Sequence, residues 1–525
     1  MNSIEAKLTR ASILGLLLLM GFSLSFAQRN EIGKTPFLHY TVSMNDPGNH
    51  LFRVSLECRE INQDTIDFRM PVWMPGYYQI MEYPGNVRNF SVTSSGKPLP
   101  FTKTNSNTWR VISGKTSSLT VKYEVFSDRK FVANNYLDAT HAYIVPAATF
   151  MYICGKINVL VNVTVVPYSS WRNIATGLER TEKNSNSFTA PDFDILYDCP
   201  LLVGNLEELP SFTIDGINHR FIAYNPGDFN RQEFMSALEK TVKAAINIIG
   251  DIPYDEYTFI GIGPGAGGIE HLNNTTVSFS GRRLESPEGL KGMLKFLAHE
   301  YFHHYNVKRI RPYELGPFDY SREARTNLLW VSEGLTVYYE YLIVRRAEII
   351  NDEELFSSLE GDINAYENDP GREYQSLVQA SYQTWSEGPF GNKLPGPDRS
   401  ISFYNKGSVV GLILDLAIRN ATQNEKSLDD VMRHLYFTYY KKLGRGFTDA
   451  EFQQACEEIA GISLSNEFEY VYTMRELDYS KYLSFAGLSI SEETDSKTGR
   501  RKFTIARQDK PDLLQMAIYR SWSGQ

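Results

Sequence analysis

The hydrophobic pattern changes once along the chain, near residues 225–228, and this change constrains the fold most. Before it, from about residue 35 to 224, short β-branched segments such as 51–58 and 119–126 are bounded by Gly, Pro, Asn or Asp. After it, apolar residues recur at helical spacing, first over residues 231–249 before a Gly-Asp stop. The pattern therefore predicts an all-β domain followed by a mostly helical α+β domain.

Four segments follow from these patterns. We assign residues 1–27 to a signal peptide, 28–225 to an N-terminal β domain, 226–482 to a second domain and 483–525 to a C-terminal β segment. The second domain is expected to hold a strand pair at 258–262 and 275–280, and further helices at 286–307, 323–349, 353–367, 406–420, 428–442 and 448–460. The last segment has strand-like pieces at 488–492 and 502–507 and is short for an independent domain.

The first 27 residues have the features of a secretory signal peptide. Lys7 and Arg10 precede an almost unbroken apolar run over residues 13–26, and Ala27 supplies a small residue for cleavage. This run is short for a membrane span, and no second long apolar stretch follows it. We therefore expect an exported protein, periplasmic or extracellular, with no stable membrane insertion after cleavage.

Composition argues against nucleic acid as a partner and does not show whether the cysteines form disulfides. The chain has 53 basic and 62 acidic residues and a net charge of −9, which argues against nucleic acid as the main partner. None of the four cysteines forms a Cys-x-x-Cys pair, so a thiolate metal site is not expected. Export permits disulfides, and the sequence does not choose among the three full pairings of Cys58, Cys154, Cys199 and Cys456.

The strongest chemical signal is the pair His299 and His303, with Glu300 between them. Two histidines at i and i+4 on one helix face can direct ring nitrogens at one metal ion, and Glu300 can reach a water on that metal as general base. The preceding residues 290–297 carry apolar side chains at helical spacing, as a buried helix requires. The pattern predicts one Zn²⁺ per chain. The alternative is a pair of packed or solvated histidines without a metal.

A catalytic zinc site commonly has a third protein ligand, and two glutamates downstream are candidates. Glu323 and Glu333 both follow the histidines, and spacing alone does not choose between them. Glu333 lies in a segment that is otherwise apolar, where an unpaired carboxylate would be costly. This favours Glu333 as the third ligand, with a solvent-exposed glutamate at a helix end as the alternative.

Several motifs together resemble the exported glycyl aminopeptidase family, a branch of the zinc peptidases with an HExxH helix and a distant Glu ligand. They are PVWMPGY at 71–77, GGIEH at 267–271, HEYFHHYNVKRIRP at 299–312, FDY at 318–320 and LWVSEG at 329–334. In that family the glutamate of Trp-x-x-Glu-Gly is the third metal ligand, which implies Glu333. The resemblance also implies a thermolysin-like catalytic domain over residues 226–482.

The same resemblance assigns roles to residues outside the metal cluster. Gly267 and Gly268 match a glycine-rich loop that runs beside the substrate, where glycine lets the two backbones approach closely. Glu270 would then bind the free α-ammonium of the substrate; the alternative is a flexible turn with a solvated glutamate. Tyr404, in FYNKG at 403–407, would donate a hydrogen bond to the oxyanion, and its alternative is a core tyrosine.

We therefore expect a secreted zinc aminopeptidase that acts on peptides, and the resemblance implies a preference for N-terminal Gly or Ala. Family members often carry a C-terminal PDZ domain, so residues 483–525 could be the start of one. The main alternative is a secreted zinc endopeptidase that makes no use of Glu270. A further alternative is a non-catalytic surface protein in which the β domain binds peptides. The oligomeric state stays open.

Overall fold

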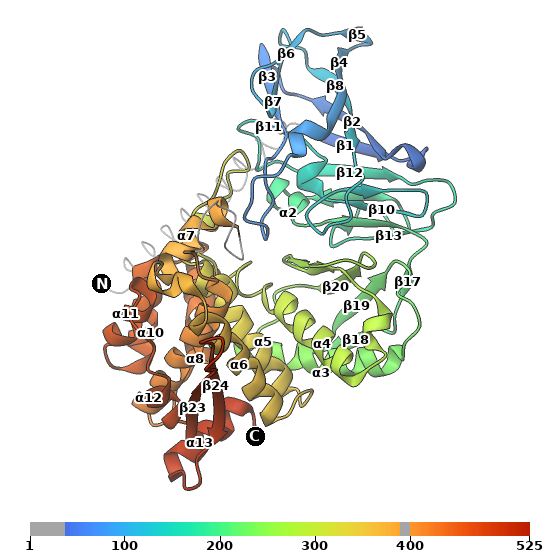
Figure 1. The fold of residues 1–525 in the computed structure, drawn as a ribbon. Helices are drawn as coiled ribbons and strands as arrows, with labels where there is room; N and C mark the ends of the chain where they lie inside the picture. Colours follow the sequence, from blue (N-terminus) through green and yellow to red (C-terminus); the bar gives the residue numbers. More distant parts are fainter. Residues whose placement is uncertain (1–36, 389–398) are drawn as a thin grey trace, which may run out of the picture.

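The computed structural model describes residues 37–388 and 399–525 as a β domain stacked on a larger mixed domain (Figure 1). The expected signal peptide, residues 1–27, lies outside the described residues. Within the described ranges, no helix combines the length and the apolarity needed to cross a bilayer. All four cysteines lie in these ranges, and each is a free thiol in the structure.

The β domain consists of one eight-stranded sheet and two four-stranded sheets, as the alternating pattern predicts. In the large sheet the order is β14 (Glu179–Arg180), β15 (Ser187–Ala190), β12 (Val161–Val166), β1 (Phe37–Ser43), β2 (Leu51–Arg59), β8 (Ser118–Phe126), β4 (Val87–Ser94), β5 (Lys97–Pro98). The other two sheets are β13 (Asn173–Ala175), β16 (Leu201–Gly204), β10 (His141–Ile144), β9 (Tyr136–Leu137), and β11 (Tyr152–Ile153), β3 (Thr65–Arg69), β7 (Thr108–Ile112), β6 (Phe101–Lys103). In β8, alternate residues are buried, which places one face of the sheet on the core.

A six-stranded sheet lies between the β domain and helices α3 (Arg231–Ile249) and α4 (Pro287–Phe302) (Figure 1). Its strands are β17 (Glu207–Glu208), β18 (Phe212–Ile214), β19 (Ile217–Ala223), β20 (Glu256–Gly261), β21 (Gly268–Glu270) and β22 (Asn274–Val277). Strands β19, β20 and β22 are parallel, and β21 pairs antiparallel with β22 at the end of the sheet.

The expected domain boundary at residue 225 falls between strands of one sheet. Strands β17, β18 and β19 lie before that boundary but belong to the sheet of the second domain. Helix α3 is the crossover that joins the parallel strands β19 and β20, and parallel neighbours require such a connection. A change in periodicity marks where helices begin, and it does not show with which sheet the preceding strands pair.

The helical part contains the remaining helices, several of which match the expected ranges. Their bounds are η7 (Trp330–Gly334), α5 (Leu335–Arg346), α6 (Asp352–Glu367), α7 (Leu377–Glu387), α8 (Phe403–Ala421), α9 (Leu428–Leu435), η9 (Tyr436–Leu443), α10 (Asp449–Ala460), α11 (Ser465–Tyr472), α12 (Tyr479–Ser484) and α13 (Leu513–Ser523). The helix expected to start at 323 starts near Trp330 instead. Side-chain bonds hold the intervening segment as a loop: Arg325 binds Glu323 and the carbonyl of Tyr382, and Thr326 binds Glu314.

The C-terminal segment packs as part of the second domain. A hairpin of β23 (Leu488–Thr494) and β24 (Arg501–Arg507) is followed by α13, a helix that the strand-like pattern did not predict. Asn364 on α6 exchanges two hydrogen bonds with the backbone of Phe503, and the Trp522 indole on α13 donates to the Tyr338 hydroxyl on α5. These contacts join residues 488–523 to the helical core. A PDZ-like identity for them stays a prediction.

Each domain also buries a side chain in the core of the other. Trp73, in the PVWMPGY loop of the β domain, is buried in the core of the second domain, and its indole donates to the carbonyl of Asp319 at 2.9 Å. In return, Tyr320 is buried in the core of the β domain. The backbone N–H of Val72 donates to the carbonyl of Tyr320, also at 2.9 Å. The loop at residues 71–78 is thereby held against the second domain.

Candidate metal centre and active site

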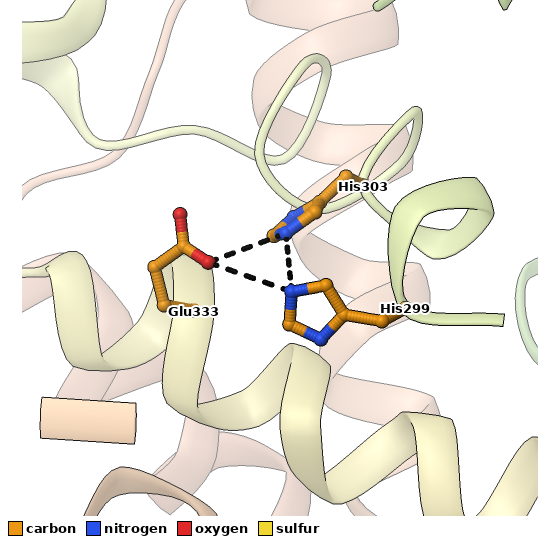
Figure 2. A group of neighbouring side chains, drawn as sticks. All are labelled: His299, His303 and Glu333. Carbon is orange, nitrogen blue, oxygen red and sulfur yellow. Dashed lines mark hydrogen bonds and ion pairs between the residues drawn. The ribbon is translucent and has the colours of Figure 1, made fainter. Parts of the chain in front are cut away.

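Helix α4 places the two motif histidines side by side. The helix begins as predicted, with the Ser286 hydroxyl accepting from the N–H of Gly289 and Pro287 in the first turn. His299 and His303 then lie one turn apart on one face, and their Nε2 atoms are 2.9 Å apart. Both rings are directed toward the same point (Figure 2). The i, i+4 spacing accounts for this arrangement because such residues share a face.

Glu333 reaches the histidines from the neighbouring segment η7, a π-helical turn. Its Oε2 lies 3.3 Å from Nε2 of His303 and 3.7 Å from Nε2 of His299 (Figure 2). Short π-helical turns occur often at functional sites, because the wider turn redirects a side chain. Glu323, the alternative ligand, pairs with Arg325 at 2.6 Å and is not part of this group.

The donor set fits a zinc ion. Nδ1 of His299 lies 2.8 Å from Oε2 of Glu340, and Nδ1 of His303 lies 2.7 Å from the carbonyl of Asn306. Each Nδ1 therefore carries the hydrogen, and both Nε2 lone pairs point at each other and at the Glu333 carboxylate. Three buried acceptors this close repel one another unless a cation lies between them, and two histidines with one carboxylate are a common zinc set.

Two glycines bring η7 against helix α8. A Cβ on Gly334 would lie 2.6 Å from Cα of Gly407, and a Cβ on Gly407 would lie 2.9 Å from Cα of Gly334. Only glycine fits at such a crossing, which explains the glycines in Trp-x-x-Glu-Gly and in FYNKG. The same crossing brings Tyr404, three residues before Gly407, to the side of Glu333.

Glu300 lies under strand β21. It is buried, its Oε2 has no hydrogen-bond partner among the residues that the structure describes, and a Cβ on Gly268 would lie 2.3 Å from its carboxyl carbon. Burial raises the pKa of Glu300 to about 8, and the negative charges of Glu270 and Glu333 add to this effect. A carboxylate with a raised pKa is suited to take up a proton and to release it again.

Strand β21 ends at Glu270, which is also buried. The strand lies at the end of the sheet order, so in the described part of the chain its outer edge is free to pair with an extended peptide. The Glu270 carboxylate packs against Gly76 of the β domain, where a Cβ would lie 2.8 Å from Oε2. Its Oε1 has no hydrogen-bond partner within the described ranges. Gly267 precedes the strand with a φ of 91°, a conformation that glycine adopts without strain.

Tyr404 lies close to the predicted site residues. Burial and the charge of Glu333 raise the pKa of its phenol well above the ordinary value, and Tyr78, Glu270 and Glu300 contribute further. Such a phenol stays protonated and serves as a hydrogen-bond donor. The structure thus brings Tyr404, Glu270 and Glu300 together around the His-His-Glu cluster.

A small cavity borders Glu270 on the side of the β domain. Its volume is about 70 Å³. The wall is largely apolar, with Trp73, Pro75 and Tyr78 from the β domain facing Val307, Leu315 and Phe318 from the second domain. Charged residues also line it: Lys308 pairs with Asp198 at 2.5 Å, and Asp194 and Arg311 lie in the same wall.

Comparisons with known families agree with this geometry. The model of the M61 peptidase N-terminal domain matches residues 39–205, and that of the M61 glycyl aminopeptidases matches residues 292–410. The chain belongs to the M61 glycyl aminopeptidase family. It is a zinc aminopeptidase. No curated protein matches the sequence.

Solved structures of aminopeptidases share the fold. An aminopeptidase N family protein from Idiomarina loihiensis is 25% identical, with a TM-score of 0.83 over 88% of this chain and 80% of its own. An M1 zinc metallopeptidase from Deinococcus radiodurans is 14% identical, with a TM-score of 0.53 over 85% of this chain and 95% of its own. A mutant of that enzyme is bound to a Tyr-Ser-Ala substrate, at 16% identity, a TM-score of 0.51, and 84% and 94% coverage.

Two residues beside the cluster, Glu340 and Tyr78, were not predicted from the sequence. Glu340 binds Nδ1 of His299, and its signal is a carboxylate two helical turns after Glu333. Tyr78 directly follows the PVWMPGY motif, and burial with the charges of Glu333 and Glu270 raises the pKa of its phenol well above the ordinary value. Only the folded chain shows that this β-domain residue lies close to Glu333 and Glu270.

Proposed function

We propose that this M61 enzyme removes N-terminal Gly or Ala from peptides, with Glu300 as general base and one zinc ion per chain. The observation that carries the proposal is Glu270, a buried carboxylate with an oxygen that has no partner among the described residues, at the end of a free strand edge. A peptide paired along β21 would direct its α-ammonium at Glu270 and its first carbonyl at the His-His-Glu cluster. An acetylated N-terminus offers no cation to this carboxylate.

His299, His303 and Glu333 would hold the zinc ion. A zinc ion held there would supply a Lewis acid, which can activate water and polarise a carbonyl. Glu300 takes a proton from the attacking water and delivers it to the leaving amine. Tyr404 donates a hydrogen bond to the carbonyl oxygen as negative charge develops there.

The size of the cavity beside Glu270 supports the preference for small first residues. The side chain and the amine of the first residue branch from the same Cα, so the side-chain pocket borders the amine anchor. A cavity of about 150 Å³ holds benzene, whose six carbons set a scale of about 25 Å³ each. The 70 Å³ beside Glu270 then accommodates two or three carbons. Gly and Ala fit, whereas Leu and Phe require the walls to move.

The experiment compares Gly-, Ala-, Leu- and Phe-initiated peptides, each with a free and an acetylated N-terminus. Zinc-loaded enzyme should cleave the free Gly and Ala peptides, and Glu300→Gln should retain zinc but lose this activity. Equal cleavage of acetylated peptides would identify an endopeptidase instead. Hydrolysis by Glu300→Gln at the wild-type rate would remove the general base from the mechanism.

Metal content provides a separate test of the ligand set. We expect one zinc per chain in the wild type and none retained by Glu333→Ala. Glu323→Ala is the matched control, because this glutamate pairs locally with Arg325. Zinc loss from Glu323→Ala together with retention by Glu333→Ala would reverse the assignment.

Export rests on the sequence of residues 1–27 alone. We propose cleavage after Ala27, with the mature enzyme in the periplasm or outside the cell. N-terminal sequencing of the protein isolated from cell fractions tests this. A mature chain that begins near residue 28 outside the cytoplasm supports export, and an intact N-terminus in the cytoplasm contradicts it.

A further inference from the structure

A buried charge cluster lies directly behind Glu270. Asp198, at the end of helix α2 (Phe193–Tyr197) in the β domain, accepts the backbone N–H of Leu272 at 2.7 Å. Its other oxygen lies 2.5 Å from Nζ of Lys308 and 3.3 Å from Nδ1 of His271. Burial opposes ionisation of Asp198, but Lys308 and His271 hold its pKa below the ordinary value. A β-domain carboxylate thus binds the turn that follows Glu270.

Arg309 holds the other side of the same turn. Its Nη1 donates to the carbonyl of Leu272 at 2.9 Å and to that of His304 at 2.7 Å, and Nη2 donates to the carbonyl of Pro253 at 3.0 Å. Both backbone polar groups of Leu272 therefore bind charged side chains. Because Lys308 and Arg309 follow the metal helix closely, the turn has a fixed position relative to His303.

The side chain of Glu270 packs against Gly76 but has little hydrogen-bond support of its own. Its Oε1 has no partner among residues 37–388 and 399–525, and β21 is a three-residue strand paired on one side. The position of the carboxylate therefore depends on the backbone that follows it. We propose that Asp198 is a positioning residue, by which the β domain sets the place of the amine anchor Glu270. This inference rests on the proposed role of Glu270.

The chain offers a matched control for loss of a buried carboxylate. Asp415 on α8 accepts the backbone N–H of Leu428 at 2.9 Å and pairs with Arg419 at 3.0 Å, both side chains being buried. Asp198 and Asp415 therefore both accept a backbone N–H and pair with a cation; the third partner is His271 for Asp198 and the Tyr338 hydroxyl for Asp415. Breaking either buried ion pair destabilises the fold, because it leaves a charge without its partner. Of the two, Asp198 contacts the turn after Glu270.

The experiment compares Asp198→Asn with Asp415→Asn in the zinc-loaded full chain. Both variants should unfold at lower temperature. Displacing a binding group by about 1 Å can cost about 100-fold, so Asp198→Asn should raise KM for a free-amine Gly peptide about 10- to 100-fold. Zinc content should not change, and kcat should change much less than KM. Asp415→Asn should keep the wild-type KM.

A second arm separates positioning from a general structural effect. In a Glu270→Gln background, Asp198→Asn should raise KM no further, because both substitutions act through the same carboxylate. Additive effects, an unchanged KM in Asp198→Asn, or an equal rise in Asp415→Asn would overturn the inference. If a single variant fails to fold, the paired replacements Asp198→Ala with Lys308→Met and Asp415→Ala with Arg419→Met carry the same expectations, since neither leaves an unpaired charge.

Failure of the proposed aminopeptidase function would give results different from failure of the Asp198 positioning role. Wild-type enzyme would then cleave acetylated peptides as well as free ones, and Glu270→Gln would leave KM unchanged. Failure of the positioning role alone would leave the wild-type preference and the Glu270→Gln effect intact.

Discussion

Adding one methyl group at Gly268, as in Gly268→Ala, should strongly impair catalysis. A Cβ at this position would lie 2.3 Å from the carboxyl carbon of Glu300, whereas ordinary contact begins at 3.4 Å. The Glu300 carboxylate must therefore move by about 1 Å, or strand β21 must shift by as much. A displacement of this size can cost about 100-fold in rate. Gly268→Ala should lower kcat/KM about 100-fold while zinc stays bound.

The control for this substitution lies on the metal helix itself. Gly292 on α4 is exposed, and a Cβ added there would meet no atom of the described residues within 4 Å. Gly292→Ala should keep full activity and stabilise the helix by about 1 kcal/mol. The assay is steady-state hydrolysis of a free-amine Gly peptide, with zinc content and unfolding temperature measured in parallel. Wild-type kcat/KM in Gly268→Ala would refute the proposed placement of Glu300 beneath β21.

Three further predictions concern single residues. Tyr404→Phe should lower kcat about 100- to 1,000-fold with little change in KM, as expected for loss of an oxyanion donor. An unchanged kcat in steady-state assays would show that Tyr404 only packs in the core. Phe318→Ala should enlarge the cavity beside Glu270 and raise kcat/KM for Leu-initiated relative to Gly-initiated peptides at least about tenfold. If this ratio of kcat/KM values does not change, the side chain of the first substrate residue binds outside this cavity. His219 is buried, and burial lowers its pKa to about 4. The unfolding free energy should therefore fall by up to about 3 kcal/mol between about pH 6.5 and 4, as the unfolded state takes up the proton. In urea titrations, the unfolding free energy of His219→Gln should depend less on pH than that of the wild type. The same pH dependence in both proteins would contradict this assignment.

The parts of the site that lie on one helix were predictable from the sequence. The i, i+4 spacing of His299 and His303 fixes their shared face, and Ser286 with Pro287 marks the start of their helix. Helix α3 has the bounds that its apolar period predicts. These features depend on local geometry, which a single sequence carries.

Features that depend on contacts between distant segments were not predictable. The sequence did not show that β19 pairs with β20 across residue 225, because strand pairing has no signature in periodicity. Asp198 and Lys308 are 110 residues apart, and their ion pair joins two segments whose pairing no local pattern shows. The π-helical turn at Glu333 lies where Gly334 crosses Gly407, and this contact exists only when both segments are in place.

The most direct test of the account compares one Gly-initiated peptide with its N-acetylated form, using zinc-loaded wild type and Glu270→Gln. The wild type should cleave the free peptide far better than the acetylated one. Glu270→Gln should lose most of this preference through a higher KM, because its neutral amide attracts the ammonium less. Equal cleavage of both peptides by the wild type, or an unchanged preference in Glu270→Gln, would contradict the assignment of Glu270 as the amine anchor.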